Sequence, residues 1–258
     1  MILSRLLIAG LLLCGVVLPA NAQAPLNFEA SYVVRLYGLT IGKASFKGSV
    51  EGDRYEVDGS LASAGLARVF DRTNASATMT GRLSPGRVVP ERFTLDYDQD
   101  GRRSKTDIAF RNGNVATTKI SPEPRKSSKK LVPLRSGDLV SVADPVSATL
   151  LARGTPQQIC GRTLRIFEGA TRIDVELSLA ATGFVYGVGN SAVTCKGRFI
   201  PVAGFERGNG TFEYMREHSD LEFVYAPADR GLYMLHSLSA RTEIGRVEMR
   251  AQTRRIDN

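Results

Sequence analysis

The stretch RFTLDYDQDGRRSKTDIAFRNG, residues 92–113, decides the fold class. Apolar side chains at Phe93, Leu95 and Tyr97 alternate with polar ones, and the alternation returns in the second half of the stretch. A period of two is typical of strands that bury one face and expose the other. Asp100-Gly101 lies between the two halves, and both residue types favour tight turns. The stretch therefore predicts two antiparallel strands joined by a hairpin.

The same alternation recurs along most of the chain. Strands with one apolar and one polar face build a sheet that is covered on one side only. A long sheet of this kind must curl, split or close, because a flat one would expose a wide apolar face. We therefore predict a mainly β protein with a single large curled antiparallel sheet of about twelve strands, as a β-spiral, half-barrel or open barrel. Other clear alternating runs begin at Phe28, Tyr55, Ile173 and Val247.

One segment departs from the β pattern. The sequence DPVSATLLAR, residues 144–153, has Asp144 as an N-cap and Pro145 at the first helical position, and Gly154 follows as a stop. These signals predict one short helix over 144–153, placed at the mouth or on the concave face of the sheet. Residues 65–71 predict a shorter helical turn.

The first 22 residues have the layout of a secretory signal peptide. An apolar run over residues 6–18 follows a single arginine, and Ala20-Asn21-Ala22 is a small-x-small cleavage site. The run is shorter than the roughly 20 residues that span a bilayer, so we do not expect an integral membrane protein. Export to the periplasm with cleavage after Ala22 would leave residues 23–258 as a single β-rich domain. A lipoprotein signal at Cys14 is the alternative, although a leucine precedes it where such signals carry a small residue.

The chain has a formal net charge of +8, and much of it lies in one loop. Residues 119–137 hold six cations and one acid, together with three prolines that prevent regular structure throughout. The cations Arg125, Lys126, Lys129 and Lys130 are candidates for contact with anionic lipid or cell-wall polymer. A solvated connector is the alternative interpretation. We do not expect nucleic acid as a partner, because no aromatic residue lies between these cations.

Two cysteines, Cys160 and Cys195, follow the predicted cleavage site. An even number of cysteines in an oxidising compartment predicts a disulfide. The bridge would close a loop of 34 intervening residues. Because it restricts the unfolded chain, it should raise the free energy of unfolding by about 3–4 kcal/mol.

The two histidines do not indicate a metal site or a cofactor. His218 lies among acidic residues, and His236 shares the parity of an apolar run, where a core histidine with a hydrogen-bond partner is the common case. Neither has ligand spacing to a second histidine. His236 as a general base is the alternative.

No catalytic motif stands out, so we predict a protein that is not an enzyme. Ser147 lies in the predicted helix and lacks the Gly-x-Ser-x-Gly context of a hydrolase. Asp174 and Glu176 should point outward from one strand, together with Arg172. The glycine-rich GVGNSA, residues 187–192, lacks the lysine and helix of a phosphate loop. A hydrolase with an unrecognised site is the least favoured hypothesis.

Taken together, the landmarks resemble the secreted bacterial family called domain of unknown function 3108. The resemblance rests on FEASYVVRLYGLTIGKASF (28–46), the helix DPVSATLLAR, the two cysteines, KGRFIPVAGF (196–205) and the closing hairpin (230–249). It implies a periplasmic, mostly antiparallel β protein without an assigned enzymatic activity.

The leading hypothesis is a periplasmic envelope protein that binds a lipid, an acyl chain or an extended partner in a concave apolar groove. A lipoprotein or a cell-wall component are the other partners considered. The second hypothesis is an interaction module for cell-wall polymer or protein that uses the basic loop.

Overall fold

The computed structural model describes residues 24–65, 67–123, 129–229 and 231–257. They form one antiparallel sheet of 14 strands in the order β7-β6-β5-β4-β3-β2-β1-β14-β13-β12-β11-β10-β9, and β8 pairs with β13 beside this path. The curled antiparallel sheet is confirmed, with two strands more than the number expected. The strands are β1 (Leu26–Leu36), β2 (Leu39–Glu51), β3 (Arg54–Ser63), β4 (Thr73–Ser84), β5 (Arg87–Gln99), β6 (Arg102–Arg111), β7 (Asn114–Ser121), β8 (Leu151–Arg153), β9 (Thr163–Phe167), β10 (Arg172–Val185), β11 (Gly189–Ala203), β12 (Leu221–Pro227), β13 (Leu232–Thr242) and β14 (Gly245–Asp257).

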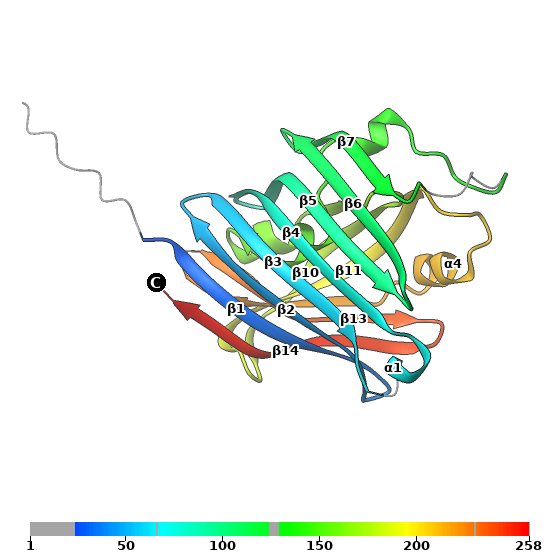
Figure 1. The fold of residues 1–258 in the computed structure, drawn as a ribbon. Helices are drawn as coiled ribbons and strands as arrows, with labels where there is room; N and C mark the ends of the chain where they lie inside the picture. The colour runs from blue at the N-terminus through cyan, green and yellow to red at the C-terminus, as the bar shows by residue number, and fades with distance from the viewer. Residues whose placement is uncertain (1–23, 66, 124–128, 230, 258) are drawn as a thin grey trace, which may run out of the picture.

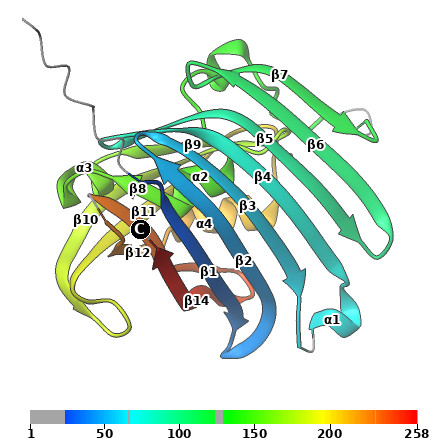
Figure 2. The same ribbon diagram turned by 60° about the vertical axis from the view of Figure 1, so that its left-hand side comes forward.

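The sheet consists of two meanders that meet at the chain's first and last strands. β1 pairs with β14 from Asn27↔Asp257 to Leu36↔Val247, which joins β1–β7 to β9–β14. β7 and β9 are the two end strands, so the sheet does not close. Figures 1 and 2 show β1–β7 curling over the short helices and the C-terminal strands.

The helix predicted over 144–153 is real but shorter. α2 covers Pro145–Leu150, and Asp144 caps it by accepting hydrogen bonds from the amides of Val146 and Ser147. The helix prediction was wrong for the last three residues, which form β8. The reason is that an extended conformation buries both Leu151 and Ala152 and lets their backbone pair with β13. The other helices are α1 (Ala67–Phe70), within the predicted 65–71, the 3-10 helix η1 (Ser136–Leu139), α3 (Pro156–Cys160) and α4 (Gly210–Glu217).

The hydrophobic core lies between the inner face of the sheet and the layer formed by α2, β8 and α3. One cross-strand row of the sheet packs against this layer, and all its side chains are buried. α2, β8 and α3 contribute Leu150, Leu151 and Ile159, each at most 2% exposed. The row runs through Phe28, Gly48, Val57, Met79, Phe93 and Ile108.

Gly48 is required in this row by a close approach of the backbone. A Cβ atom at this position would lie 2.3 Å from the carbonyl oxygen of Glu56 and 3.0 Å from the ring of Phe28. The missing side chain lets the ring of Phe28 lie over the strand at this point.

Candidate functional site

The inner face of the sheet stays apolar beyond the buried core. The next two cross-strand rows are only partly covered, and Leu61 is 40% exposed. A surface that is apolar and partly open to water is a candidate for binding an apolar ligand. We call this surface the inner patch, and it consists of Phe46, Leu61, Ala75, Ala77, Leu95 and Tyr97.

Large apolar side chains are also exposed at the chain connections next to the inner patch. We call them the rim: Tyr37, Leu39, Val69, Phe70 and Ile244, with exposed fractions from 60% to 86%. They belong to the β1–β2 turn, to α1 between β3 and β4, and to the β13–β14 turn. These connections lie at the same end of neighbouring strands, because the sheet order is β4-β3-β2-β1-β14-β13. Figure 2 shows α1 and the β1–β2 turn together at the lower end of the molecule.

The segments that carry the rim are basic. Residues 35–43, 65–72 and 241–246 hold six Lys and Arg residues against two acids. Exposed aromatic and aliphatic side chains beside cations are typical of proteins that contact the surface of an anionic membrane.

Two hollows lie over the strands around β1. One, of about 660 Å³, spreads over β1–β4, and its lining combines serines such as Ser31 and Ser45 with apolar residues that include Leu61 and Ala75 of the inner patch. A second, of about 480 Å³, is lined by charged residues, including Glu29 and Arg255, which form an ion pair at 3.7 Å. The first hollow borders the inner patch, and the second is charged, so the inner patch is the better site for an apolar ligand.

A buried polar cluster lies at the opposite end of the core, where α2 begins. Asp144 is fully buried, and the Tyr55 hydroxyl donates a hydrogen bond of 2.8 Å to Ser147 Oγ. Burial raises the pKa of Asp144 to about 6, and hydrogen bonds from Ser147 and Val146 only partly offset it. Burial, followed by the nearby Asp144, also raises the pKa of Tyr55. The cluster caps a helix inside the core and reaches no cavity that the structure describes.

The hydrolase candidates from the sequence do not come together. Ser147 has Tyr55 as its partner, and the cavity beside His236 is lined by no acid among the described residues. His218 is exposed and stacks on Tyr214 at 4.3 Å.

The pair Asp174 and Glu176 binds arginines and faces no cleft among the described residues. Glu176 is paired with Arg198 at 2.6 Å. The outward orientation expected for Arg172 was wrong. Its side chain is 0% exposed, because it pairs with Asp174 at 2.6 Å and its Nε donates to the carbonyl oxygen of Asp138 at 2.9 Å.

The structure describes only part of the basic loop. Arg125 and Lys126 lie outside the described residues, and residues 119–121 belong to β7. Lys129 and Lys130 are exposed, and the carbonyl oxygen of Lys130 accepts a hydrogen bond of 2.9 Å from the amide of Arg207. Contact of these cations with the envelope therefore stays a prediction.

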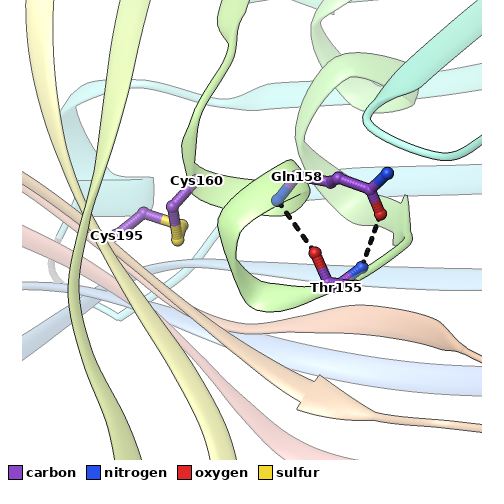
Figure 3. Close-up of a disulfide and its surroundings, with 4 residues drawn as sticks. All are labelled: Thr155, Gln158, Cys160 and Cys195. Carbon is purple, nitrogen blue, oxygen red and sulfur yellow. Dashed lines mark hydrogen bonds between the residues drawn. A yellow bond between two sulfur atoms is a disulfide. The ribbon is translucent and has the colours of Figure 1, made fainter.

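The structure contains the disulfide between Cys160 and Cys195, with a Cα–Cα distance of 5.3 Å. Figure 3 shows how it joins the end of α3 to β11. The start of α3 is fixed by a capping box, in which Thr155 Oγ1 accepts from the amide of Gln158 and Gln158 Oε1 accepts from the amide of Thr155. Both ends of the short helix are thus anchored beside the core.

The rim was missed by the sequence analysis, because its residues lie in turns and outside the alternating runs. The available signal was the pairing of large apolar residues with glycine turns, as in Tyr37-Gly38-Leu39 and Ile244-Gly245. Such residues have no core to enter, so their exposure could have been anticipated.

Within the described ranges, no helix is long and apolar enough to cross a membrane. The same residues contain no cluster of three or more His, Cys, Asp or Glu side chains that could hold a metal ion.

A protein with a similar fold is known. The crystal structure of a β-barrel-like protein of domain of unknown function DUF1849 from Brucella abortus superimposes with a TM-score of 0.51. It is 9% identical in sequence, and the similarity covers 90% of this chain and 98% of that chain. At this identity the similarity shows the fold alone.

None of the curated proteins matches the sequence. The family described as Protein of unknown function (DUF3108) matches residues 28–252. The match runs from β1 into β14 and includes both cysteines and α2. The chain therefore belongs to the DUF3108 family, as the landmarks of its sequence indicated.

Proposed function

We propose that the protein is a periplasmic envelope protein without enzymatic activity, which binds the acyl chain of a lipid on the inner patch while its rim contacts a lipid surface. The single observation that carries this proposal is that the apolar inner patch and the exposed apolar rim lie at the same end of the sheet. A chain leaving a bilayer would meet the rim first and then the patch.

The energetics of an acyl chain fit such a surface. Each methylene removed from water contributes about 0.8 kcal/mol. Ten methylenes would therefore contribute about 8 kcal/mol before the costs of ordering the chain are subtracted. The cations near the rim add attraction to anionic headgroups.

The export that the sequence predicts agrees with this proposal. Residues 1–23 lie outside the described residues, so the signal peptide rests on the sequence. The disulfide is compatible with an oxidising compartment.

The test uses the absence of tryptophan from the chain. The variant Phe70→Trp places a single tryptophan on the rim, where Phe70 is 86% exposed. The matched control is Val140→Trp, because Val140 is also exposed, at 45%, but lies far from the rim. The next residue, Ser141, donates its amide to Asn114 at the opposite end of the strands.

We expect the fluorescence of Phe70→Trp to shift to the blue when vesicles of phosphatidylethanolamine and phosphatidylglycerol are added, and that of Val140→Trp to stay unchanged. A second substitution, Leu61→Glu, in the Phe70→Trp variant should weaken the uptake of a spin-labelled fatty acid by the inner patch without changing the fold. Equal responses of the two reporters, or unchanged uptake in the Leu61→Glu variant, would refute the proposal.

A further inference from the structure

β13 changes its neighbour at His236. Up to Met234 it pairs with β8, and from Ser237 onward it pairs with β14. On its other side β12 pairs Tyr225 with Leu235 and Val224 with Ser237, so His236 is the extra residue of a β-bulge. Bulges re-aim side chains and are frequent next to functional sites.

β14 has its own irregularity at the facing position. Its pairing with β1 skips Gln252, between Tyr32↔Ala251 and Ser31↔Thr253. Between the two strands lies a cavity of about 360 Å³. Its lining consists of Tyr186, Gly187, His236 and the β14 residues from Arg250 to Arg254.

The turn between β10 and β11 lies over this cavity. A Cβ atom on Gly187 would lie 3.2 Å from Cε1 of His236, so the turn packs directly on the imidazole. Arg254 Nη2 donates a hydrogen bond of 3.4 Å to the carbonyl oxygen of Gly187, which ties the turn to β14. Gly187 in the glycine-rich sequence 187–192 thus permits close packing over His236.

Two polar side chains of the cavity have buried nitrogens without a hydrogen-bond partner among the described residues. His236 is 5% exposed, and neither ring nitrogen has a hydrogen-bond partner among the described residues. Nη1 of Arg254 is also buried without a partner there. Arg250 binds Glu248 at 2.7 Å, and the lining itself contains no acid among the described residues.

The electrostatics of the cavity favour an anion. Burial, followed by the charges of Arg254 and Arg250, lowers the pKa of His236, while Glu248 opposes this effect. A neutral imidazole between two guanidinium groups offers an N–H donor in a region of positive potential. Buried donors that lack partners cost free energy, and an oxyanion would satisfy several of them at once.

We propose that the cavity between β13 and β14 is a binding site for an oxyanion of the phosphate or carboxylate type, held by Arg254 and His236. The planar guanidinium of Arg254 matches either group with two parallel hydrogen bonds. The cavity has about twelve times the volume of a water molecule in the liquid, so it also has room for the group that carries the anion. This site is independent of the inner patch.

The chain has two histidines, which makes side-chain NMR a selective test. The wild-type protein is titrated with inorganic phosphate, acetate or dihexanoyl phosphatidylglycerol, with sodium chloride of equal ionic strength as the reference. We expect the imidazole signals of His236 to shift saturably, while those of the exposed His218 follow the sodium chloride reference.

Saturation by phosphate or acetate would support the site and identify a free oxyanion as sufficient. Saturation by the short-chain lipid alone would support it and identify a lipid headgroup as the source. The proposal is overturned if no titrant saturates His236, or if both histidines move together.

A pair of variants then assigns the donor. Arg254→Gln should weaken the saturation of His236 about tenfold or more, the effect of losing a charged hydrogen bond. The matched control is Arg255→Gln, one position along β14, because Arg255 is 72% exposed and pairs with Glu29. It should leave the affinity within about twofold. Equal effects of the two substitutions would contradict the role of Arg254, and the wild-type titration decides the site if the Arg254 variant does not fold.

Discussion

Replacing Asp144 with asparagine should stabilise the protein at pH 8 and do so much less at pH 4.5. Asp144 is fully buried and caps α2 through Oδ1, which accepts from the amides of Val146 and Ser147. Asparagine is an equally good N-cap, so the substitution keeps the cap and removes the charge. It also resembles the protonated form of the acid in shape and in its lack of charge.

The magnitude follows from the pKa. Burial raises the pKa of Asp144 from its ordinary value of 3.8 to about 6. Between these two pH values the folded state binds a proton that the unfolded state has released, so the free energy of unfolding falls as the pH rises from about 4 to 6. At about 1.4 kcal/mol per pH unit, the ionised group costs about 3 kcal/mol above pH 6. An asparagine side chain at the same position has no such cost, because it does not ionise.

The assay is urea-induced unfolding of both proteins at pH 4.5 and at pH 8. We expect the variant to gain about 2 kcal/mol over the wild type at pH 8 relative to the difference at pH 4.5, because about 1 kcal/mol of the cost is already present at pH 4.5. Asp96→Asn is the control, because the Asp96 side chain is 60% exposed and pairs with Lys105 at the surface. A stability difference between wild type and Asp144→Asn that is the same at both pH values would refute the reasoning.

Three further predictions concern stability alone. Replacing both disulfide cysteines with serine should lower the free energy of unfolding by about 3–4 kcal/mol in urea, because the bridge closes a loop of 34 residues. Gly48→Ala should lower the free energy of unfolding by about 2 kcal/mol or more in thermal unfolding, because its Cβ would lie 2.3 Å from the carbonyl oxygen of Glu56. The control Gly137→Ala should change it by no more than about 0.5 kcal/mol, because no atom lies within 4 Å of its Cβ position. Tyr55→Phe removes the 2.8 Å hydrogen bond to Ser147 and should cost about 1–2 kcal/mol in urea, and an unchanged midpoint would contradict this.

The hairpins were predictable because their signals are local. β5 and β6 occupy the stretch 92–113 as expected, and the turn after β6 has positive φ at Asn112 (54°) and Gly113 (77°). The pairing of β1 with β14 was not predictable, because it joins residues more than 200 positions apart and has no local sequence signal. Contacts of that kind depend on which edges the rest of the chain leaves free.

The site was less predictable than the fold, for a physical reason. Alternation shows which side chains share a face but not how far the covering layer extends. Leu61 follows the parity of buried Val57, yet it is 40% exposed because the core layer of α2, β8 and α3 covers only one end of the sheet. The alternation of β13 assigned His236 to the apolar face, but His236 is the extra residue of a β-bulge. The alternation of side chains in the sequence does not reveal a bulge.

An open sheet of this length leaves two end strands, and here the chain between β7 and β9 pairs with the edge of β9 and contacts the start of β7. The amide of Val142 donates to the carbonyl oxygen of Gly113 in the β6–β7 turn, and Ala143 exchanges hydrogen bonds with Arg165 and Phe167 around β9. The adjoining residues 130–132 pair with residues 204–207 after β11. The backbone of the predicted basic loop therefore fastens the sheet, because a free edge invites pairing with other chains. Because the backbone of residues 130–132 is already hydrogen-bonded, a contact of this part of the loop with a partner would use its side chains.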